Sequence, residues 1–249
     1  MKIKFKQLIK NSAILSLPGI ISIFISLLSI PIHLNYAGAE SYGNYMIFHF
    51  VLMISTNFNF GIGKSAVVSI NNYPKKNEEI NFSALNYTKN ISIIIFTVFI
   101  LMFLFRDVFF YDYTKYFNIV SYFFFGSIIT IFFMTLEGIL QGNQKFKFIS
   151  IFNLSFFSLS ISVPSILLAY SYNLTLENLI LISILIKLLS VLMMFVIVKK
   201  NNLIKKSKSQ ILFNNLKKNS RWITLNSVLV QFYDLFDKYL IKFFLGPVA

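Results

Sequence analysis

Seven apolar runs, each about 20 residues or longer, constrain this chain more than any other feature of its sequence. An α-helix of that length crosses the roughly 30 Å of hydrocarbon in a bilayer. Inside lipid, a helix satisfies its own backbone hydrogen bonds and an isolated strand does not. The predicted fold class is therefore all-α, a polytopic transmembrane helical bundle. The predicted spans are 13–34, 44–70, 84–106, 117–140, 148–170, 178–198 and 222–245.

Composition agrees with a membrane protein and narrows the chemistry. Hydrophobic residues make up 56% of the chain and charged residues 13%, whereas soluble domains average about 25% charged residues. The mean hydropathy is +0.70. Cysteine is absent, and His33 and His49 are too few for a histidine-based metal site. We therefore expect no disulfide, no metal and no cofactor.

The positions of the basic residues predict the orientation, because Lys and Arg near span ends stay on the cytoplasmic side. Of the 23 basic residues, 17 fall in the connections on one side, 2 on the other, and 4 inside the spans. We therefore expect a multi-pass membrane protein with its amino terminus in the cytoplasm. The same asymmetry accounts for the net charge of +14, so no nucleic-acid partner is predicted.

The longest polar stretch, 199–221, lies on the predicted cytoplasmic side and is rich in lysine. Two interpretations stay open. It could be an interfacial segment held against anionic lipid headgroups, because each cation near a charged surface contributes about 1 kcal/mol. It could equally be a solvated linker between two halves of the protein.

Ionisable residues inside the spans are informative because each costs at least about 2.5 to 3.5 kcal/mol at the bilayer centre. Lys187 lies about ten residues from either end of its span, roughly 15 Å of helix, which is beyond the reach of a lysine stem. We expect Lys187 to face a cavity or a carboxylate. Lys64 and Glu137 lie nearer span ends and can reach the headgroups.

The seventh run is polar on one side only. At about 100° per residue its polar side chains share an arc of roughly 160°, and its aromatic residues occupy the opposite side. Asp234 and Lys238 lie four residues apart and can offset each other's charge. We expect one face toward lipid and the other toward a wet interior, with a helix lying flat at the interface as the alternative. The residues of the polar face are Thr224, Asn226, Ser227, Gln231, Asp234, Asp237, Lys238 and Lys242.

In the second run, Gly61 and Gly63 permit a bend or a close helix contact, and Asn57 and Lys64 share a face. No strand precedes these glycines, so they do not indicate a nucleotide site. The chain also lacks a phosphate-binding loop, a Ser/His/Asp set and a His-Glu-x-x-His pattern. We therefore expect no enzyme. A membrane enzyme would need a large external loop or a His/Asp site.

Two glycine-containing endings indicate an internal repeat. Aligning Gly38 with Gly246 superposes two spans that both run outward, with an offset of 208 residues and six spans per repeat. Parallel repeats of six spans are typical of transporters, whose substrate path runs between the halves.

Four segments carry a resemblance to a known family: PIHLNYAGAESYGNYMIF at 31–48, FGIGKSAVVSI at 60–70, EGILQGNQKFKFISI at 137–151 and FDKYLIKFFLGPVA at 236–249. On these residues the chain resembles the polysaccharide biosynthesis proteins, the O-antigen and capsule flippases of the multidrug/oligosaccharidyl-lipid/polysaccharide exporter superfamily.

The resemblance implies twelve to fourteen helices in two similar bundles and transport by alternating access. The substrate it implies is an oligosaccharide linked to undecaprenyl pyrophosphate, destined for O-antigen, lipopolysaccharide or capsule. The partners it implies are a polysaccharide polymerase and chain-length proteins, beside the anionic lipids expected at the basic loops, and the location it implies is the bacterial cytoplasmic (inner) membrane. Together with the polar residues inside the spans, it makes the following residues candidates for the substrate path: Asn57, Asn59, Lys64, Lys187, Asp234, Asp237, Lys238 and Lys242.

Two departures from the family pattern matter. Relatives often carry an acid before the Gly-x-Gly of the second span, where this chain has Asn59, which puts ion coupling at that position in doubt. The sequence also resembles only part of an exporter: a first bundle at 1–198, a basic linker at 199–221 and the first helix of a second bundle at 222–249. It therefore resembles a truncated flippase. The alternatives are a drug or metabolite exporter of the same superfamily and a nonfunctional remnant.

Overall fold

A computed structural model of the chain describes residues 5–57, 60–105, 117–170, 174–205 and 209–245. These residues are helical or lie in short connections, and they contain no strand, which confirms the all-α fold class. The α-helices are α1 (Phe5–Asn57), α2 (Ile62–Asn72), α3 (Asn77–Leu104), α5 (Phe117–Gly142), α6 (Phe146–Asn153), α7 (Ser160–Leu167), α8 (Leu176–Lys200) and α9 (Gln210–Leu245). A 3₁₀ turn, η1 (Pro74–Lys76), precedes α3, and a π-helical segment, η3 (Leu154–Leu159), joins α6 to α7.

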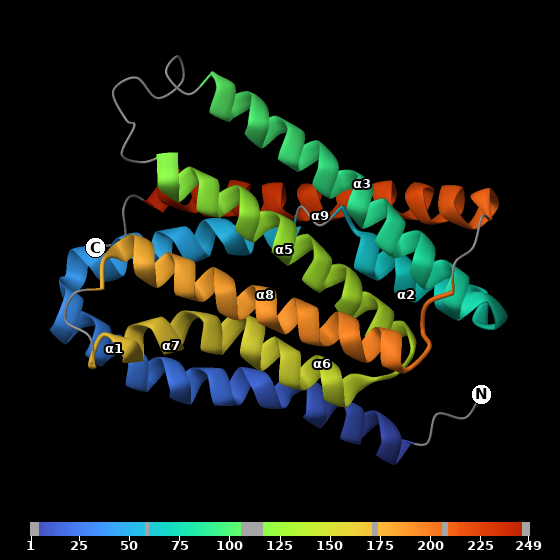
Figure 1. Ribbon diagram of the computed structural model, residues 1–249, viewed down its shortest axis with the longest axis horizontal. Coiled ribbons are helices and arrows are strands. Elements are labelled where there is room, and N and C mark those ends of the chain that lie inside the picture. The colour runs from blue at the N-terminus through green and yellow to red at the C-terminus, as the bar shows by residue number, and fades with distance from the viewer. Residues whose placement is uncertain (1–4, 58–59, 106–116, 171–173, 206–208, 246–249) are drawn as a thin grey trace.

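The long element α1 consists of two helices that meet at Gly38. Its backbone there has φ 81° and ψ 167°, a conformation that favours glycine because it has no Cβ. Figure 1 shows the first helix running along one edge of the molecule and the second turning back toward α2. The first two predicted spans are therefore present, and they are joined at Gly38.

The second span does not continue as one helix to residue 70, so that part of the prediction is wrong. Phe60 has φ 54° and Gly61 has φ 60°, and a new helix, α2, begins at Ile62. A Cβ on Gly61 would lie 2.8 Å from the Cβ of Ile223 on α9. The bend and the close helix contact expected of this glycine pair are both confirmed.

The helix of the third span, α3, starts seven residues before the predicted start, and the fourth, fifth and sixth spans agree with prediction to within three residues. Five helical stretches among the described residues are long and apolar enough to cross a membrane, and the first of them contains the reversal at Gly38. Outward-facing side chains of α8, such as Leu189 and Met193, are 59% and 63% exposed. Exposed leucine and methionine along a whole helix are typical of a surface that faces lipid.

α9 begins at Gln210, twelve residues before the predicted start of the seventh span. The second half of the basic stretch 199–221 is thus part of the same helix as the seventh span. Leu212 and Leu216 are buried in a cluster formed with residues of α2 and α3. These two leucines form a buried face of α9, but they lie among lysines in the sequence. The polar composition of the stretch therefore suggested a linker.

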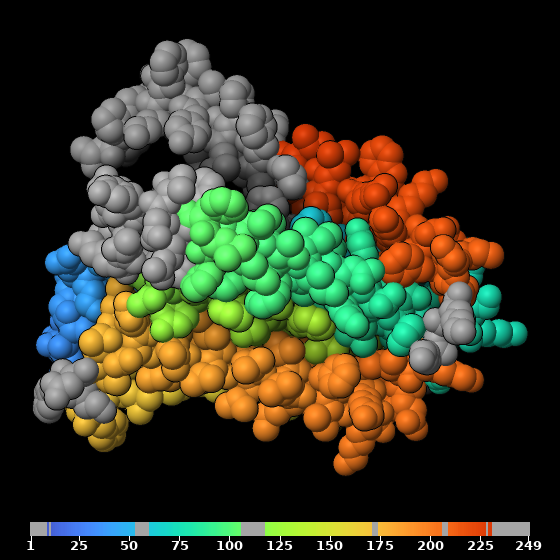
Figure 2. Space-filling view, turned by 45° about the horizontal axis from the view of Figure 1, so that its top comes forward, coloured from blue at the N-terminus to red at the C-terminus, as the bar shows by residue number. Residues whose placement is uncertain are grey.

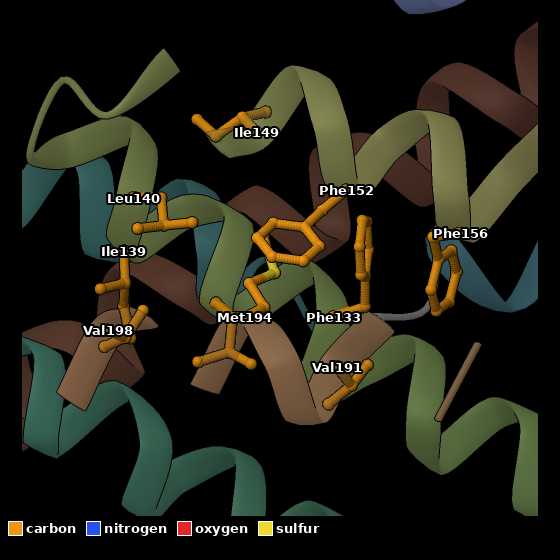
Figure 3. Packing of buried hydrophobic residues seen from close by; sticks show 10 residues of the cluster. Phe133, Ile139, Leu140, Ile149, Phe152, Phe156, Val191, Met194 and Val198 are labelled. Atoms are coloured by element: carbon orange, nitrogen blue, oxygen red, sulfur yellow. The ribbon is translucent and has the colours of Figure 1, made fainter. Parts of the chain in front are cut away.

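α5 is the central helix, and it packs against α1, α2, α3, α6 and α8. Figure 2 shows α3 and α8 at the surface with α5 recessed between them. In the core beside α5, the rings of Phe133 and Phe156 stack with centroids 3.9 Å apart. Figure 3 shows these rings face to face, with Val191 and Met194 of α8 beside them. Aromatic stacking and aliphatic packing therefore hold α5, η3 and α8 together.

Candidate functional site

Lys187, in the middle of α8, is only 5% exposed and lines a cavity of about 120 Å³ inside the bundle. Its Nζ lies 4.9 Å from the ring centroid of Phe156, close enough for a cation–π interaction. The predicted cavity at this lysine is therefore present. Among the described residues, no carboxylate lines the cavity. Its lining residues are Met46, His49, Phe50, Leu52, Thr130, Phe156, Phe157, Ile161 and Lys187.

The π-helical segment η3 contributes Phe156 and Phe157 to this wall. A π-helix leaves some carbonyl groups without their usual helical partners, and such segments are common at functional sites. Here the hydroxyl of Tyr45 donates to the backbone oxygens of Ser160 and Ile161, at 3.3 and 3.0 Å. Tyr45 is fully buried. It therefore fastens the start of α7, directly after η3, to the second helix of α1.

Two buried histidines flank Tyr45. The ring of His33 lies 5.3 Å from the Tyr45 ring, centroid to centroid, and the ring of His49 lies 4.6 Å from it. His33 Nδ1 pairs with Ser165 Oγ at 2.9 Å, and His49 Nε2 pairs with Ser183 Oγ at 3.2 Å. In the part of the chain that the structure describes, His33 Nε2 and His49 Nδ1 have no hydrogen-bond partner.

Sequence reasoning missed this part of the site. It weighed His33 and His49 only as metal ligands, and the described residues hold no cluster of three His, Cys, Asp or Glu residues that could bind a metal. Their partners lie more than 130 positions away in the sequence, so no local pattern connects them. One local signal was available, because Tyr45 and His49 are four residues apart and share a face of the second span.

A seam of serines joins the helices around this site. Ser29 donates to Ser162 at 3.3 Å, and Ser155 and Ser190 pair at 2.7 Å. Ser22 pairs with Ser158 in the same seam. Small hydroxyl-bearing residues let membrane helices approach closely and bond across the interface. The seam therefore holds α1, η3, α7 and α8 in register around Lys187 and His49.

The other predicted site residues are not brought to this cavity by the described part of the structure. Lys64 is exposed on α2 and does not line the cavity. Glu137 accepts a hydrogen bond from Asn153 Nδ2 at 3.0 Å, a contact between α5 and α6. The remaining candidates lie outside the described side chains; they are Asn57, Asn59, Asp234, Asp237, Lys238 and Lys242.

A second contact of functional interest joins α9 to the break in the second span. Ser65 Oγ donates to the backbone oxygen of Leu216 at 2.9 Å, and Ser220 Oγ donates to the backbone oxygen of Phe60. Both bonds lie near Gly61, the residue before α2, where a Cβ would lie 2.9 Å from the backbone oxygen of Ser220 on α9. The irregular backbone of the second span is thus satisfied by α9, the helix predicted to begin the second bundle.

The exposed side of α9 near its start is basic. A hollow of about 620 Å³ lies along this face. Trp222 is 63% exposed there, as expected of an interfacial aromatic residue. The arrangement agrees with the interfacial interpretation of 210–221, although contact with anionic headgroups stays a prediction. The residues that line the hollow are Asn214, Lys217, Lys218, Arg221, Trp222 and Leu225.

The fold is similar to that of several solved transporters. One is the outward-facing conformation of a multidrug resistance MATE family transporter of the MOP superfamily, with TM-score 0.68 and 16% identity. Another is a MATE protein in complex with MaL6, with TM-score 0.68 and 15% identity. A third is a MOP superfamily transporter from Pyrococcus furiosus, described by a reversed polarity of its binding pocket, with TM-score 0.65 and 15% identity.

Each of these likenesses covers 96% of this chain and 57% of the transporter, so the chain spans a little over half the length of each. At these identities the likeness shows the fold, which is that of a multi-pass membrane transporter. No curated protein sequence matches the chain. The model of the family described as polysaccharide biosynthesis protein matches residues 8–249, nearly the entire sequence. The chain therefore belongs to the polysaccharide biosynthesis protein family.

Proposed function

We propose that this chain takes part in moving an oligosaccharide linked to undecaprenyl pyrophosphate across the bacterial cytoplasmic membrane, for assembly of O-antigen, capsule or another surface polysaccharide. The observation that carries this proposal is the family match over residues 8–249, together with an exporter fold over 96% of the chain. Transport of this kind changes no covalent bond. It requires a path for polar groups and a change of access between the two faces of the membrane.

The charges inside the bundle suit an anionic substrate. The described membrane-embedded helices bury Lys187 beside a cavity, while the carboxylate of Glu137 is engaged by Asn153. A pyrophosphate and acidic sugars would meet a cationic path favourably, because unpaired charges in a low-dielectric interior interact strongly. In this proposal Lys64, Lys238 and Lys242 extend that path along α2 and α9.

The same proposal gives α9 a mechanical role. α9 closes against the break in the second span through Ser65 and Ser220. Alternating access moves one bundle against the other around a fixed substrate site. The α2–α9 contact then opens in one state and closes in the other, and its small hydroxyl bonds can break without exposing charge.

A drug or metabolite exporter is the second candidate, and two MATE structures with TM-score 0.68 favour it. Exporters of organic cations need acidic groups in their cavity. Among the described residues, the cavity at Lys187 has a lysine and a histidine in its wall and no acid. This argues for the anionic, lipid-linked substrate.

The test is complementation in a bacterial strain that lacks its own flippase and accumulates lipid-linked repeat units on the cytoplasmic side. Expression of the chain should restore surface polysaccharide, detected by immunoblot of whole cells. Lys187→Met should reduce the restored signal at least about tenfold because the cationic path is interrupted. Lys147→Met removes an exposed lysine outside the cavity and should leave the signal unchanged.

Membrane abundance of each variant, measured with a carboxyl-terminal tag, separates loss of transport from loss of folding. A chain that accumulates in the membrane without restoring any surface polysaccharide would count against the proposal. Resistance of the same strain to cationic dyes would then support the drug-exporter alternative.

A further inference from the structure

Lys187 has an uncompensated charge in the described part of the bundle. It is 5% exposed, about ten residues from either end of α8, and none of the residues that line its cavity is acidic. A charged group at this depth normally pairs with an opposite charge. The face of Phe156, at 4.9 Å, offers a weaker, quadrupolar interaction. Among the described side chains no carboxylate compensates this charge, and an anion that fits beside the ammonium group would do so.

The wall of the cavity is rich in donors and poor in acceptors. Lys187 brings three N–H groups, and His49 brings an Nδ1 atom without a partner among the described residues. When His49 Nε2 accepts from Ser183, the unpartnered Nδ1 carries the proton and is a donor. The hydroxyl of Thr130 donates to the backbone oxygen of Gly126 at 2.7 Å. The rest of the wall is apolar or aromatic, so a cation has no ligands here.

The size of the cavity limits the occupant. Its volume of about 120 Å³ is that of roughly four water molecules at about 30 Å³ each. Pockets for drug-sized ligands span about 300 to 1,000 Å³, so a pyrophosphate-linked sugar does not fit. A monatomic anion with one or two waters does.

We propose that the cavity lined by Lys187 and His49 is a binding site for a small monovalent anion of the halide class, chloride under cellular conditions. The anion neutralises Lys187 inside the bundle and accepts from the free imidazole N–H of His49. Tyr45 and Ser183 set the spacing of the two donors by bonding the second helix of α1 to α7 and α8. The inference deepens the proposed function at this lysine: the anion keeps Lys187 charged in the state of this structure, and the substrate's phosphates meet Lys187 only after the bundle opens.

The direct test is equilibrium binding of ³⁶Cl⁻ to the purified full chain in detergent. We expect saturable binding of about one chloride per chain. Unlabelled bromide should displace it, because bromide has the same charge and nearly the same size. Gluconate should not, because it is too large for the cavity, and inorganic pyrophosphate should not at a similar concentration, because it carries several negative charges where the cavity offers one lysine. Displacement by pyrophosphate at a similar concentration would overturn the proposal and point to a site for the substrate's phosphates.

Variants then locate the site. Lys187→Met should weaken chloride binding at least tenfold, Lys187→Arg should largely retain it, and His49→Gln should weaken it severalfold. Lys147→Met makes the same change at an exposed lysine outside the cavity and should bind as the wild type does. If Lys187→Met does not fold, His49→Gln and the displacement series on the wild type decide the question.

Three results would overturn the inference. The first is absence of saturable chloride binding to the wild type, which would mean that the cavity holds water and the lysine is neutral. The second is unchanged binding in Lys187→Met. The third is an equal loss in Lys147→Met, which would mean that chloride binds the surface. Each readout is obtained without transport, so it remains separate from the outcome of complementation.

Discussion

Tyr45 illustrates how single residues hold the inner polar site. Its hydroxyl donates to the backbone oxygens of Ser160 and Ile161, next to the π-helical segment, and its ring separates His33 from His49. Tyr45→Phe keeps the ring and removes the donor to both oxygens: the Ile161 oxygen keeps its bond from Ser165 Oγ at 3.3 Å, and the Ser160 oxygen loses this partner. We expect a loss of about 1 to 3 kcal/mol in the free energy of unfolding, seen as a lower Tm of the purified protein.

The matched control is Tyr170→Phe, which makes the same change at a side chain that is 82% exposed. Its Tm should equal that of the wild type. Equal Tm values for Tyr45→Phe and the wild type would show that the hydroxyl bonds to Ser160 and Ile161 make no net contribution to the free energy of unfolding.

Gly63 allows α2 to cross α5 at backbone contact. A Cβ at Gly63 would lie 2.3 Å from the backbone oxygen of Met134, and a Cβ at Gly138 would lie 2.3 Å from the oxygen of Gly63. Neither neighbour is a flexible side chain, so the helices must separate. Gly63→Ala should destabilise the protein by about 1 to 3 kcal/mol or more and lower the monodisperse peak in fluorescence-detected size-exclusion chromatography.

Gly43→Ala is the control for that substitution, because a Cβ at Gly43 meets nothing within 4 Å. Its peak height should match the wild type. A normal peak for Gly63→Ala would mean that α2 and α5 are farther apart than the structure has them.

The depth of Lys187 in its span predicted from the sequence that its side chain faces a cavity or a carboxylate. A lysine about ten residues from either span end needs such a neighbour wherever the other helices lie. The neighbours of Lys187 could not be predicted in the same way. His49 reaches it only because the reversal at Gly38 returns the chain along α8 and η3, and that tertiary arrangement leaves no periodic trace in the sequence.

At the scale of elements, hydrophobic length predicted the first six spans, because crossing a bilayer requires about 20 apolar residues. α9, which contains the predicted seventh span, is not among the five stretches of the described residues that are long and apolar enough to cross a membrane. Local irregularities escaped that reasoning. The apolar run 44–70 continues through Phe60 and Gly61, although the backbone turns left-handed there. The π-helical residues 154–159 have the same composition as their helical neighbours. The early start of α9 was hidden because two buried leucines lie among lysines.

The register of α8 against η3 is open to a direct test, because the chain contains no native cysteine. Ser155 and Ser190 have their Oγ atoms 2.7 Å apart, within the range from which two cysteines can form a disulfide after small adjustments. The double variant Ser155→Cys, Ser190→Cys should therefore form an intramolecular disulfide under mild oxidation, seen as a mobility shift on a non-reducing gel.

The control pairs Ser155→Cys with Ser183→Cys. Position 183 lies seven residues, about 10 Å, before position 190 on α8 and should not cross-link. If the 155/183 pair cross-linked efficiently and the 155/190 pair did not, the register of α8 against η3 would differ by two helical turns from that of the structure.

For the whole molecule, the main prediction still to be measured is its membrane orientation, that is, which end of the bundle faces the cytoplasm. The connections after α2, after α5 and after α8 carry nearly all the loop lysines between helices, and the alternation of antiparallel helices places these three connections at one end of the bundle. The turn after α7 lies at the other end, as Figure 1 shows. The retention of positive residues on the cytoplasmic side then orients the entire bundle.

We therefore expect a single cysteine at Tyr170, after α7, to react with a membrane-impermeant maleimide in cells whose outer layers admit the reagent but whose cytoplasmic membrane is intact. A single cysteine at Gln141, near the end of α5, should react only after that membrane is permeabilised, since both positions are exposed. The cysteine-free chain is the blank for both. Labelling of Gln141→Cys in intact cells, with Tyr170→Cys protected, would invert the bundle and put the basic hollow of α9 on the outer face, away from the anionic lipids of the inner leaflet.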